Sequence, residues 1–223
     1  MVTLQINSNG KTQTGKFALH IPMTKLLIAT TNPGKIKEIT SLLEGLPYQV
    51  IGLSDLPESY EVVEETGSTF TENAIIKSEY YFAQTGILSL ADDSGLEVDA
   101  LNGAPGIYSA RFAGEDATDA DRVIKLLADL LSIPIENRGA RFVCSIAITG
   151  FEDGTKTFEG VALGVIAQAS RGENGFGYDS IFQDVNSGKT FAELDRTEKS
   201  LSSHRGKSLM LAREFLISRL KCL

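Results

Sequence analysis

"LLIATTNPGKIKEI", residues 26–39, reads as a short buried strand that leads through a Gly-containing loop into a helix. Leu26–Ala29 form the apolar strand. The helix is expected from about Lys35 to Glu44, where Gly45 and Pro47 end it. A strand that enters a helix through such a loop is typical of α/β folds, so this stretch predicts the fold class.

Helices and strands continue to alternate after this unit. Residues 68–86, "STFTENAIIKSEYYFAQTG", predict a helix, because Thr69 and Glu72 have capping-box spacing and Gly86 is a suitable C-terminal stop. "ILSLA" (87–91) predicts a strand that ends at Asp92-Asp93, and "LEVDAL" (96–101) predicts another strand. The segment "NGAPGIYSARFAG" (102–114) is expected to be a loop, followed by a helix over 119–131.

The second half of the chain is richer in strands. "ARFVCSIAITG" (140–150) and "TKTFEGVALGVIA" (155–167) predict a hairpin joined around "FEDG". A polar loop precedes the strand-like "SIFQDV" (180–185), and a linker after "TFAEL" leads to a last helix near His204. Early alternation followed by a hairpin predicts an α/β domain with a mixed sheet.

Composition excludes several classes of function. The 223 residues carry a formal net charge of -8, which disfavours general binding of nucleic acid or of a membrane surface. The chain has no apolar run long enough to span a bilayer and no N-terminal apolar region typical of a secretory signal. Anionic substrates would therefore need locally gathered Lys, Arg and metal. We expect the protein to bind neither nucleic acid nor a membrane.

Few residues are suited to bind soft metals. Cys144 and Cys222 are far apart, which predicts two free thiols and a reducing, cytoplasmic location. His20 and His204 are too few for a His-built site. Any metal is therefore expected to be held by oxygen ligands, as Mg²⁺ is.

The domain organisation is simple. Residues 1–22 are interpreted as an extension, with Met23 a plausible native start, and residues 23–223 as a single domain. The alternative is that the extension adds a hairpin to the edge of the sheet.

The first candidate site is the loop after the first strand. Backbone N–H groups at a helix N-terminus attract anions, and Lys35 adds positive charge. The spacing is not that of a Walker A loop, and an ordinary strand–turn–helix would look the same. The candidate phosphate-binding residues are Thr30, Thr31, Asn32, Pro33, Gly34 and Lys35.

The second candidate is a set of acids. Adjacent carboxylates repel each other, so Asp92 and Asp93 indicate either a solvated turn or a cation site. Glu64 and Glu65 are a second adjacent pair. Lys77 falls on the apolar face of its predicted helix, so it is either a candidate substrate-binding residue or a lysine that extends to the surface.

The third candidate combines an aromatic side chain with cations. In "GFGYD" (175–179), glycines flank Phe176, so a base can stack on its ring; Phe176 and Tyr178 suit a core equally well. Lys199, His204 and Arg205 bring positive charge to the start of the last helix, which indicates a bound anion. Acids for a metal, cations for phosphates and an aromatic ring for a base together describe a nucleoside triphosphate site.

The motifs also occur in a known order. From about Leu26 to the last helix, the chain closely resembles the inosine triphosphate pyrophosphatase (Ham1-like) family, through "ATTNPGK", "EETGSTFTENA", "ADDSGLEVDALNGAPGIYSARFAG", "GFGYDSIF" and "EKSLSSHRGK". The resemblance implies an elongated three-layer α/β fold with a central mixed sheet and two lobes around a substrate cleft. It also implies a homodimer, and Mg²⁺-dependent hydrolysis of the purine nucleoside triphosphates ITP, dITP and XTP to the monophosphate and pyrophosphate.

The resemblance also implies residue roles. Residues 30–35 match the phosphate-binding loop, Asp93 the catalytic acid that contacts Mg²⁺, and Ser94 a substrate contact. A metal-binding Glu is either Glu64 or Glu65. Thr31 stands where relatives often have Gly, so the loop must tolerate a side chain there. The matching substrate-binding residues are Phe176, Gly177, Tyr178, Asp179, Lys199, His204 and Arg205.

Two other functions remain open at this point. A Maf-like pyrophosphatase, acting on modified pyrimidine or methylated guanosine nucleotides, would share the phosphate site and differ at the base. A nucleotide-binding regulatory protein with an inactive site would lack turnover.

Overall fold

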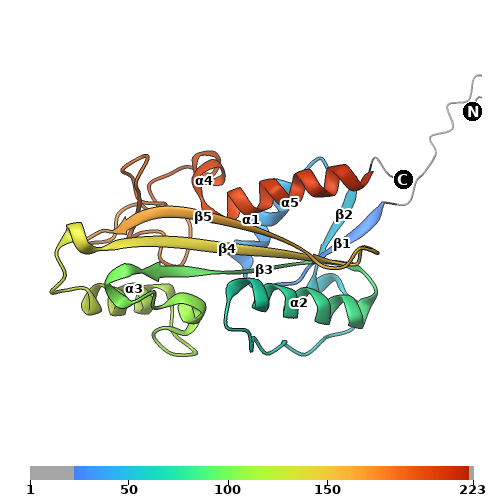
Figure 1. Ribbon diagram of the computed structural model, residues 1–223, viewed down its shortest axis with the longest axis horizontal. Helices are drawn as coiled ribbons and strands as arrows, with labels where there is room; N and C mark the ends of the chain where they lie inside the picture. The colour runs from blue at the N-terminus through green and yellow to red at the C-terminus, as the bar shows by residue number, and fades with distance from the viewer. Residues whose placement is uncertain (1–22, 221–223) are drawn as a thin grey trace, which may run out of the picture.

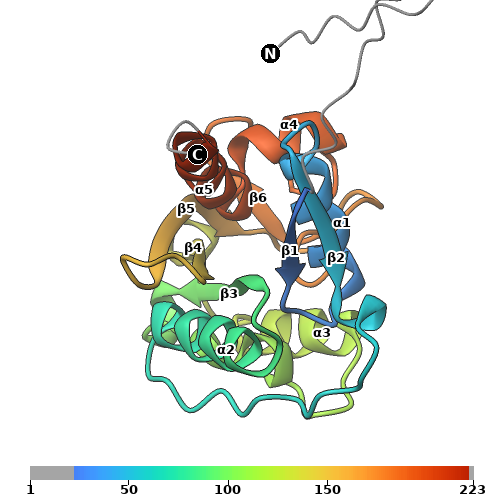
Figure 2. The ribbon, with the colours of Figure 1, turned by 90° about the vertical axis from the view of Figure 1, so that its right-hand side faces the viewer.

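The computed structural model of the protein describes residues 23–220, so the extension predicted for residues 1–22 and Cys222 lie outside the described residues. The described chain builds one six-stranded mixed sheet with helices on both faces (Figures 1 and 2). The strands are β1 (Thr24–Ile28), β2 (Tyr48–Gly52), β3 (Leu88–Val98), β4 (Gly139–Thr149), β5 (Lys156–Ile166) and β6 (Phe182–Asp184).

The sheet order is β2-β1-β3-β4-β5-β6. β1 pairs in parallel with β2 and β3, whereas β3, β4, β5 and β6 pair antiparallel in turn. The predicted α/β class with a mixed sheet is confirmed. β3, β4 and β5 have 11 residues each and run along the long axis of the molecule (Figure 1).

Helices complete the outer two layers. α2 covers one face of the sheet, and α1, α4 and α5 lie on the other (Figure 2). α3 packs through Val123 and Leu126 against Leu96 and Phe142, whose side chains lie on the same face as α5. The α-helices are α1 (Pro33–Leu43), α2 (Phe70–Thr85), α3 (Asp119–Asp129), α4 (Arg196–Ser202) and α5 (His204–Leu220). Short 3-10 helices are η1 (Leu53–Asp55), η2 (Asp99–Leu101), η3 (Gly106–Arg111) and η4 (Ile135–Asn137).

Local sequence explains where the helices start and end. Asn32 caps α1 by accepting a hydrogen bond from the Lys35 N–H at 3.1 Å, and Pro33 occupies the first turn, where it needs no donor. Thr69 caps α2 through the Glu72 N–H at 3.1 Å, and Gly86 ends it in the left-handed conformation. The predicted ends of both helices are confirmed to within a turn.

Four predictions about local structure are wrong. The strand predicted over 96–101 ends at Val98, and Asp99–Leu101 form η2. The segment 102–114, which was expected to be a loop, contains the 3-10 helix η3. The linker before the last helix contains α4, which Asp195 begins with a capping box to Glu198. The two strands predicted on either side of Asp92-Asp93 are one continuous strand, β3, because the polar side chains in its middle all have partners (below).

The core forms on both faces of the sheet. Alternate residues of β1 point to opposite sides: Leu26 and Ile28 pack with α1 and α5, whereas Leu27 and Ala29 pack with α2. A separate cluster forms the core of the other lobe, which contains α3, β6 and the adjoining ends of β3, β4 and β5. The main members of that cluster are Leu96, Leu126, Phe142, Phe182 and Phe191.

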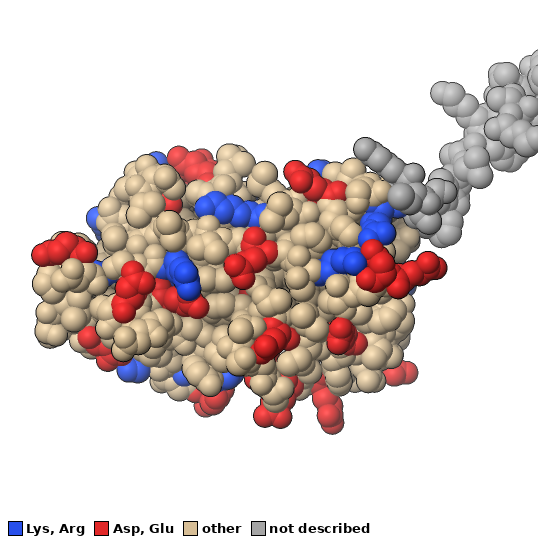
Figure 3. Space-filling model, in the orientation of Figure 1, with Lys and Arg blue, Asp and Glu red and all other residues tan. Residues whose placement is uncertain are grey.

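Surface charge is mixed. On the face shown in Figure 3, acidic and basic side chains are interspersed over the molecule. Within residues 23–220, no helix has the length and apolar character that crossing a bilayer requires.

Close packing of β5 on α5 depends on Gly160. A Cβ atom at Gly160 would lie 2.6 Å from the backbone nitrogen of Ser208 and would also overlap the carbonyl oxygen of His204. We expect Gly160→Ala to lower the free energy of unfolding by about 1–3 kcal/mol, because helix and strand must separate. Urea unfolding measures this change.

Gly52→Ala is the matched control, since the nearest atoms to its added Cβ lie 3.7 Å away. Equal losses of stability in both variants would contradict the packing argument.

Candidate functional site

A cavity of about 310 Å³ lies between the two lobes. Its walls come from the loop after β1, the middle of β3, the segment before β6, and α4 and α5. Of the residues predicted to form the site, all but Pro33, Gly34, Glu64 and Asp92 line this cavity. Their roles stay predictions, but the structure brings together residues spread over most of the chain.

The adjacent aspartates lie within β3 rather than at its end. Successive side chains of a strand point to opposite faces, so Asp92 and Asp93 do not face each other. Asp92 points toward α1 and α5, where Lys35 and Arg205 contact it, and Asp93 points toward α2, where Lys77 contacts it. Because the two carboxylates point in opposite directions and each contacts a cation, their mutual repulsion is offset within the strand and no solvated turn is needed.

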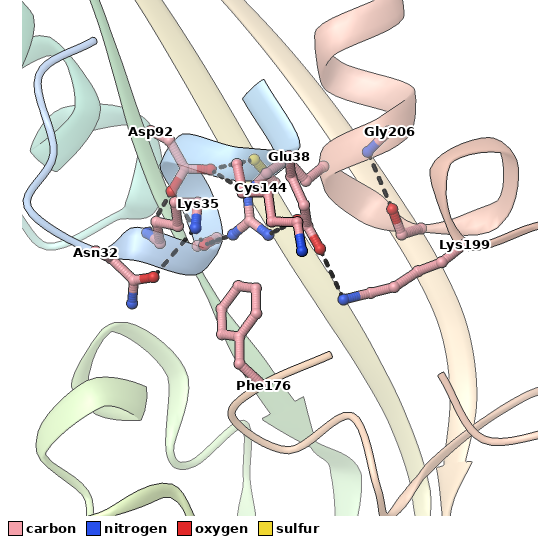
Figure 4. A network of polar contacts seen from close by, with 12 residues as sticks. Asn32, Lys35, Glu38, Asp92, Cys144, Phe176, Lys199 and Gly206 are labelled. Carbon is pink, nitrogen blue, oxygen red and sulfur yellow. Dashed lines mark hydrogen bonds and ion pairs between the residues drawn. The ribbon is translucent and has the colours of Figure 1, made fainter. Parts of the chain in front are cut away.

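Asp92 is the centre of a buried network (Figure 4). Its side chain is fully buried; Lys35 forms an ion pair with Oδ1, and Arg205 Nε lies 3.0 Å from Oδ2. The Cys144 thiol donates to Oδ2 at 2.9 Å. Although burial opposes ionisation, Arg205 and Lys35 hold the pKa of Asp92 well below its usual range. Asp92 is therefore a permanent anion that holds two cations.

Glu38 on α1 performs a similar role for the last two helices. Its Oε1 lies 2.8 Å from Lys199 Nζ, and its Oε2 lies 2.6 Å from Arg205 Nη1. Lys199 also contacts Asp179 at 2.6 Å. Burial raises the pKa of Glu38, but Arg205 and Lys199 lower it more, so the net shift is downward. Glu38 thereby links α1 to α4 and α5.

The face of β3 toward α2 carries the second group of charges. Lys77 Nζ lies 2.9 Å from Asp93 Oδ1, 2.8 Å from Glu65 Oε1 and 2.7 Å from the Asp92 carbonyl oxygen. Lys77 is buried and directed at these partners, so the alternative of a lysine that extends to the surface is wrong. Burial raises the pKa of Asp93 and outweighs Lys77 and Lys35, which lower it.

The two acidic residues before α2 differ in position. Glu65 lines the cavity, whereas Glu64 is exposed and does not. Glu65 and Asp93 share one ammonium nitrogen, so their oxygens lie within reach of a single small cation. No cluster of three or more His, Cys, Asp or Glu side chains suited to a metal occurs within residues 23–220. Two carboxylates are what Mg²⁺ takes from a protein when substrate phosphates complete its shell, so the donor set fits Mg²⁺.

The segment around Phe176 is held rigidly. The Phe176 N–H donates to Asp179 at 2.8 Å, and the Gly177 N–H donates to Asp119 at 2.7 Å. The Phe176 ring packs on Gly34, where a Cβ atom would lie 2.6 Å from the ring, and Lys199 Nζ lies 5.0 Å from its centroid. Both backbone N–H groups therefore already have acceptors within the protein. Tyr178 is buried, and its hydroxyl donates to the Ser109 carbonyl at 2.9 Å.

His204 differs from the other predicted residues because it has an unsatisfied polar atom. It is 4% exposed, and its ring stacks on Phe142 with centroids 4.5 Å apart. Its buried Nδ1 has no hydrogen-bond partner among the described residues. Burial, together with Arg205 and Lys199, holds the pKa of His204 well below its usual range, so the imidazole is neutral.

Four residues that complete this site were not predicted. Glu38, Asn73, Asp119 and Cys144 act through contacts with residues distant in the sequence. Glu38 had one local signal, since it follows Lys35 by three positions and so lies on the same face of α1. The other three had no local signal.

The loop tolerates a side chain at position 31. Thr31 is exposed, and no residue from Thr30 to Lys35 has a positive φ angle. The departure from the family pattern at this position therefore introduces no backbone strain.

The order of these motifs agrees with the model of the Ham1 family, which matches residues 26–215. The chain belongs to the Ham1 family. A relative from Geobacter sulfurreducens, named dITP/XTP pyrophosphatase, is 47% identical over 87% of this chain and 97% of its own length. A relative of the same name from Desulforamulus reducens is 50% identical over 86% of this chain and 95% of its own length.

Solved structures agree with the fold. The Staphylococcus aureus Ham1 protein superposes with a TM-score of 0.79 at 45% identity, over 88% of this chain and all of the other. A HAM1 protein from Coxiella burnetii gives 0.78 at 43% identity, over 88% and 100%. The resemblance stated from the motifs is thereby confirmed at the level of the family.

Removal of the Glu38 charge should change how stability depends on pH. The lowered pKa means that ionised Glu38 stabilises the fold above its unfolded pKa, near 4.5, and that this stabilisation is lost as pH falls through the folded pKa. We expect Glu38→Gln to lower the free energy of unfolding by about 1–3 kcal/mol at pH 7 and by less at pH 3. Urea unfolding from pH 3 to 7 measures both values.

Glu44→Gln is the control, because Glu44 is exposed at the other end of α1. It should change stability by no more than about 0.5 kcal/mol. A difference between Glu38→Gln and the unsubstituted protein that stays constant with pH would show that the Glu38 charge is not the cause.

Proposed function

We propose that the protein hydrolyses deaminated purine nucleoside triphosphates, ITP, dITP and XTP, to the nucleoside monophosphate and pyrophosphate. The observation that carries this proposal is one cavity, in a Ham1-family fold, whose lining combines the cations Lys35, Lys199 and Arg205 with the carboxylates of Glu65 and Asp93 and the ring of Phe176. Relatives 47% and 50% identical are named dITP/XTP pyrophosphatase. Such an activity removes deaminated purines from the nucleotide pool.

The triphosphate is proposed to bind along the α1 side of the cavity. The N-terminus of α1 presents N–H groups, and Lys35, Lys199 and Arg205 supply charge. Each of these cations already has a carboxylate partner, so its position is fixed before the substrate arrives. Fixed cations cost little reorganisation when negative charge develops in the transition state.

Asp93 is proposed to orient the attacking water and accept its proton. Its raised pKa makes it a better base than an exposed aspartate, and Lys77 holds one of its oxygens in place. Asp93 and Glu65 would hold Mg²⁺, which supplies charge neutralisation at the phosphates when bound. Glu65 lines the cavity and Glu64 does not, so Glu65 is the proposed ligand.

The base is proposed to lie on Phe176, next to His204. A neutral imidazole has one N–H donor, and Nδ1 lacks a partner among the described residues. An N–H there would donate to the 6-oxo oxygen of hypoxanthine or xanthine and would oppose the 6-amino group of adenine. An unpaired donor costs about 1–3 kcal/mol, and each 1.4 kcal/mol is about a tenfold preference. Discrimination against guanine, which shares the 6-oxo group, must act on its 2-amino group.

We also infer, from the resemblance, that the protein forms a homodimer and acts in the cytoplasm. Neither inference is needed for the chemistry above, and both stay predictions for this chain. The roles of Thr30, Thr31, Asn32 and Ser94 as substrate contacts are proposals of the same kind.

The substrate assay tests the proposed function directly. We expect Mg²⁺-dependent pyrophosphate release from ITP, dITP and XTP, and much slower release from GTP, ATP, dUTP and dTTP. Preference for pyrimidine or methylated nucleotides would instead support a Maf-like enzyme and contradict the roles of Phe176 and His204. Tight binding of ITP without turnover would support a regulatory protein.

Asp93→Asn tests the proposed base. It keeps the shape of the side chain but cannot accept the proton, so kcat for dITP should fall by about 100-fold or more. Binding of dITP, measured by calorimetry, should be retained. An unchanged rate would show that Asp93 is not the catalytic group.

A further inference from the structure

Asn73 is a buried polar residue on α2 that has no assigned role in the site. It is 1% exposed and lies one helical turn before Lys77, on the same face of α2. Its amide oxygen and its amide nitrogen each form a hydrogen bond within the protein. A buried amide with both ends bonded fixes the position of the two groups that it joins.

The two bonds of Asn73 have a defined direction. The Gly67 N–H donates to Oδ1 at 2.8 Å. A backbone N–H is only a donor, so the amide oxygen must face Gly67, and the NH₂ group must face the other way. There Nδ2 donates to Asp93 Oδ2 at 3.3 Å.

Asn73 and Lys77 together hold both oxygens of Asp93. Lys77 Nζ contacts Oδ1 at 2.9 Å, and Asn73 Nδ2 contacts Oδ2. With one donor on each oxygen, both from the same helix, the carboxylate cannot rotate without breaking a hydrogen bond.

The same two side chains hold the segment that carries Glu65. Lys77 contacts Glu65 directly at 2.8 Å, and Asn73 contacts Gly67, two residues further along. The segment approaches Asn73 so closely that a Cβ atom at Gly67 would lie 2.6 Å from Oδ1 and 2.9 Å from the Asn73 backbone nitrogen. Glycine at position 67 therefore permits this contact.

We propose that Asn73 is a positioning residue that orients Asp93 and fixes its separation from Glu65. This proposal rests on the proposed function, because Asp93 and Glu65 are the two carboxylates that would hold Mg²⁺. Asn73 makes no contact with the substrate in this role. Groups that hydrogen-bond a metal-binding carboxylate commonly change metal affinity or activity by about 10–100-fold when they are removed.

A purely structural role is the alternative. Asn73 lies near the N-terminus of α2, so it would then only anchor the preceding segment. That role predicts lower stability of Asn73→Ala with unchanged metal binding and unchanged turnover by the folded protein.

Asn73→Ala distinguishes the two roles. Mn²⁺ is the probe, since it takes the same oxygen ligands as Mg²⁺ and free Mn²⁺ is measured by electron paramagnetic resonance. We expect the nucleotide-free variant to bind Mn²⁺ about 10–100-fold more weakly, and kcat for dITP to fall by about as much, with little change in KM. Ser78→Ala is the matched control, because Ser78 is equally buried on α2 but bonds Thr149 instead of a carboxylate; it should change neither value.

Unchanged Mn²⁺ affinity and unchanged kcat in Asn73→Ala would overturn the proposal. If Asn73→Ala does not fold, Asn73→Asp replaces it: the shape and the acceptor for Gly67 are kept, and the donor to Asp93 is lost. We then expect a lower kcat, and a melting temperature that Mn²⁺ raises more than it raises that of the unsubstituted protein, because the ion neutralises an added charge. Equal kcat and equal Mn²⁺ response would overturn the proposal in this variant.

The Mn²⁺ titration is independent of turnover. If the unsubstituted protein binds Mn²⁺ but does not hydrolyse dITP, the proposed function fails, and the effect of Asn73→Ala on Mn²⁺ binding still decides whether Asn73 positions the carboxylates.

Discussion

The buried carboxylate of Asp92 is the interaction on which the rest of the site depends. It forms ion pairs with Lys35 from α1 and Arg205 from α5, two cations that are 170 positions apart in the chain. An unpaired buried charge is strongly destabilising. Burial of the Asp92 carboxylate therefore requires that both cations be placed beside it. The loop after β1 and the start of α5 therefore come together as a consequence of neutralising one strand residue.

Side chains alternate between the two faces of β3, so the neighbouring residues Asp92 and Asp93 bind different groups on opposite faces of the sheet. Asp92 faces α1 and α5, which carry Lys35 and Arg205, and Asp93 faces α2 with its Lys77. Each carboxylate is surrounded by a different set of charges, and the directions of their pKa shifts differ: the pKa of Asp92 is lowered and that of Asp93 is raised. One strand thus supplies, at adjacent positions, a carboxylate with a lowered pKa that pairs with two cations and a carboxylate with a raised pKa that lines the cavity.

The sequence predicted much of this arrangement because many signals are local. Helix caps at Asn32 and Thr69, the stop at Gly86 and the apolar strand of β1 depend on neighbours within a few residues. The continuity of β3 was not predictable in this way. Asp92 and Asp93 look like a turn until Lys35, Arg205 and Lys77 are placed around them, and those partners lie on other elements. Asn73 and Asp119 were missed for the same reason, since only the tertiary fold shows what their side chains contact.

The length of the central strands has a mechanical consequence. β3, β4 and β5 pass through both lobes without interruption, and 11 extended residues span roughly 36 Å. Two lobes that share three continuous strands cannot swing about a flexible linker as separate domains do. Any narrowing of the cleft must twist the shared sheet or move the segments at the rim of the cavity. The continuous sheet therefore resists relative motion of the two lobes.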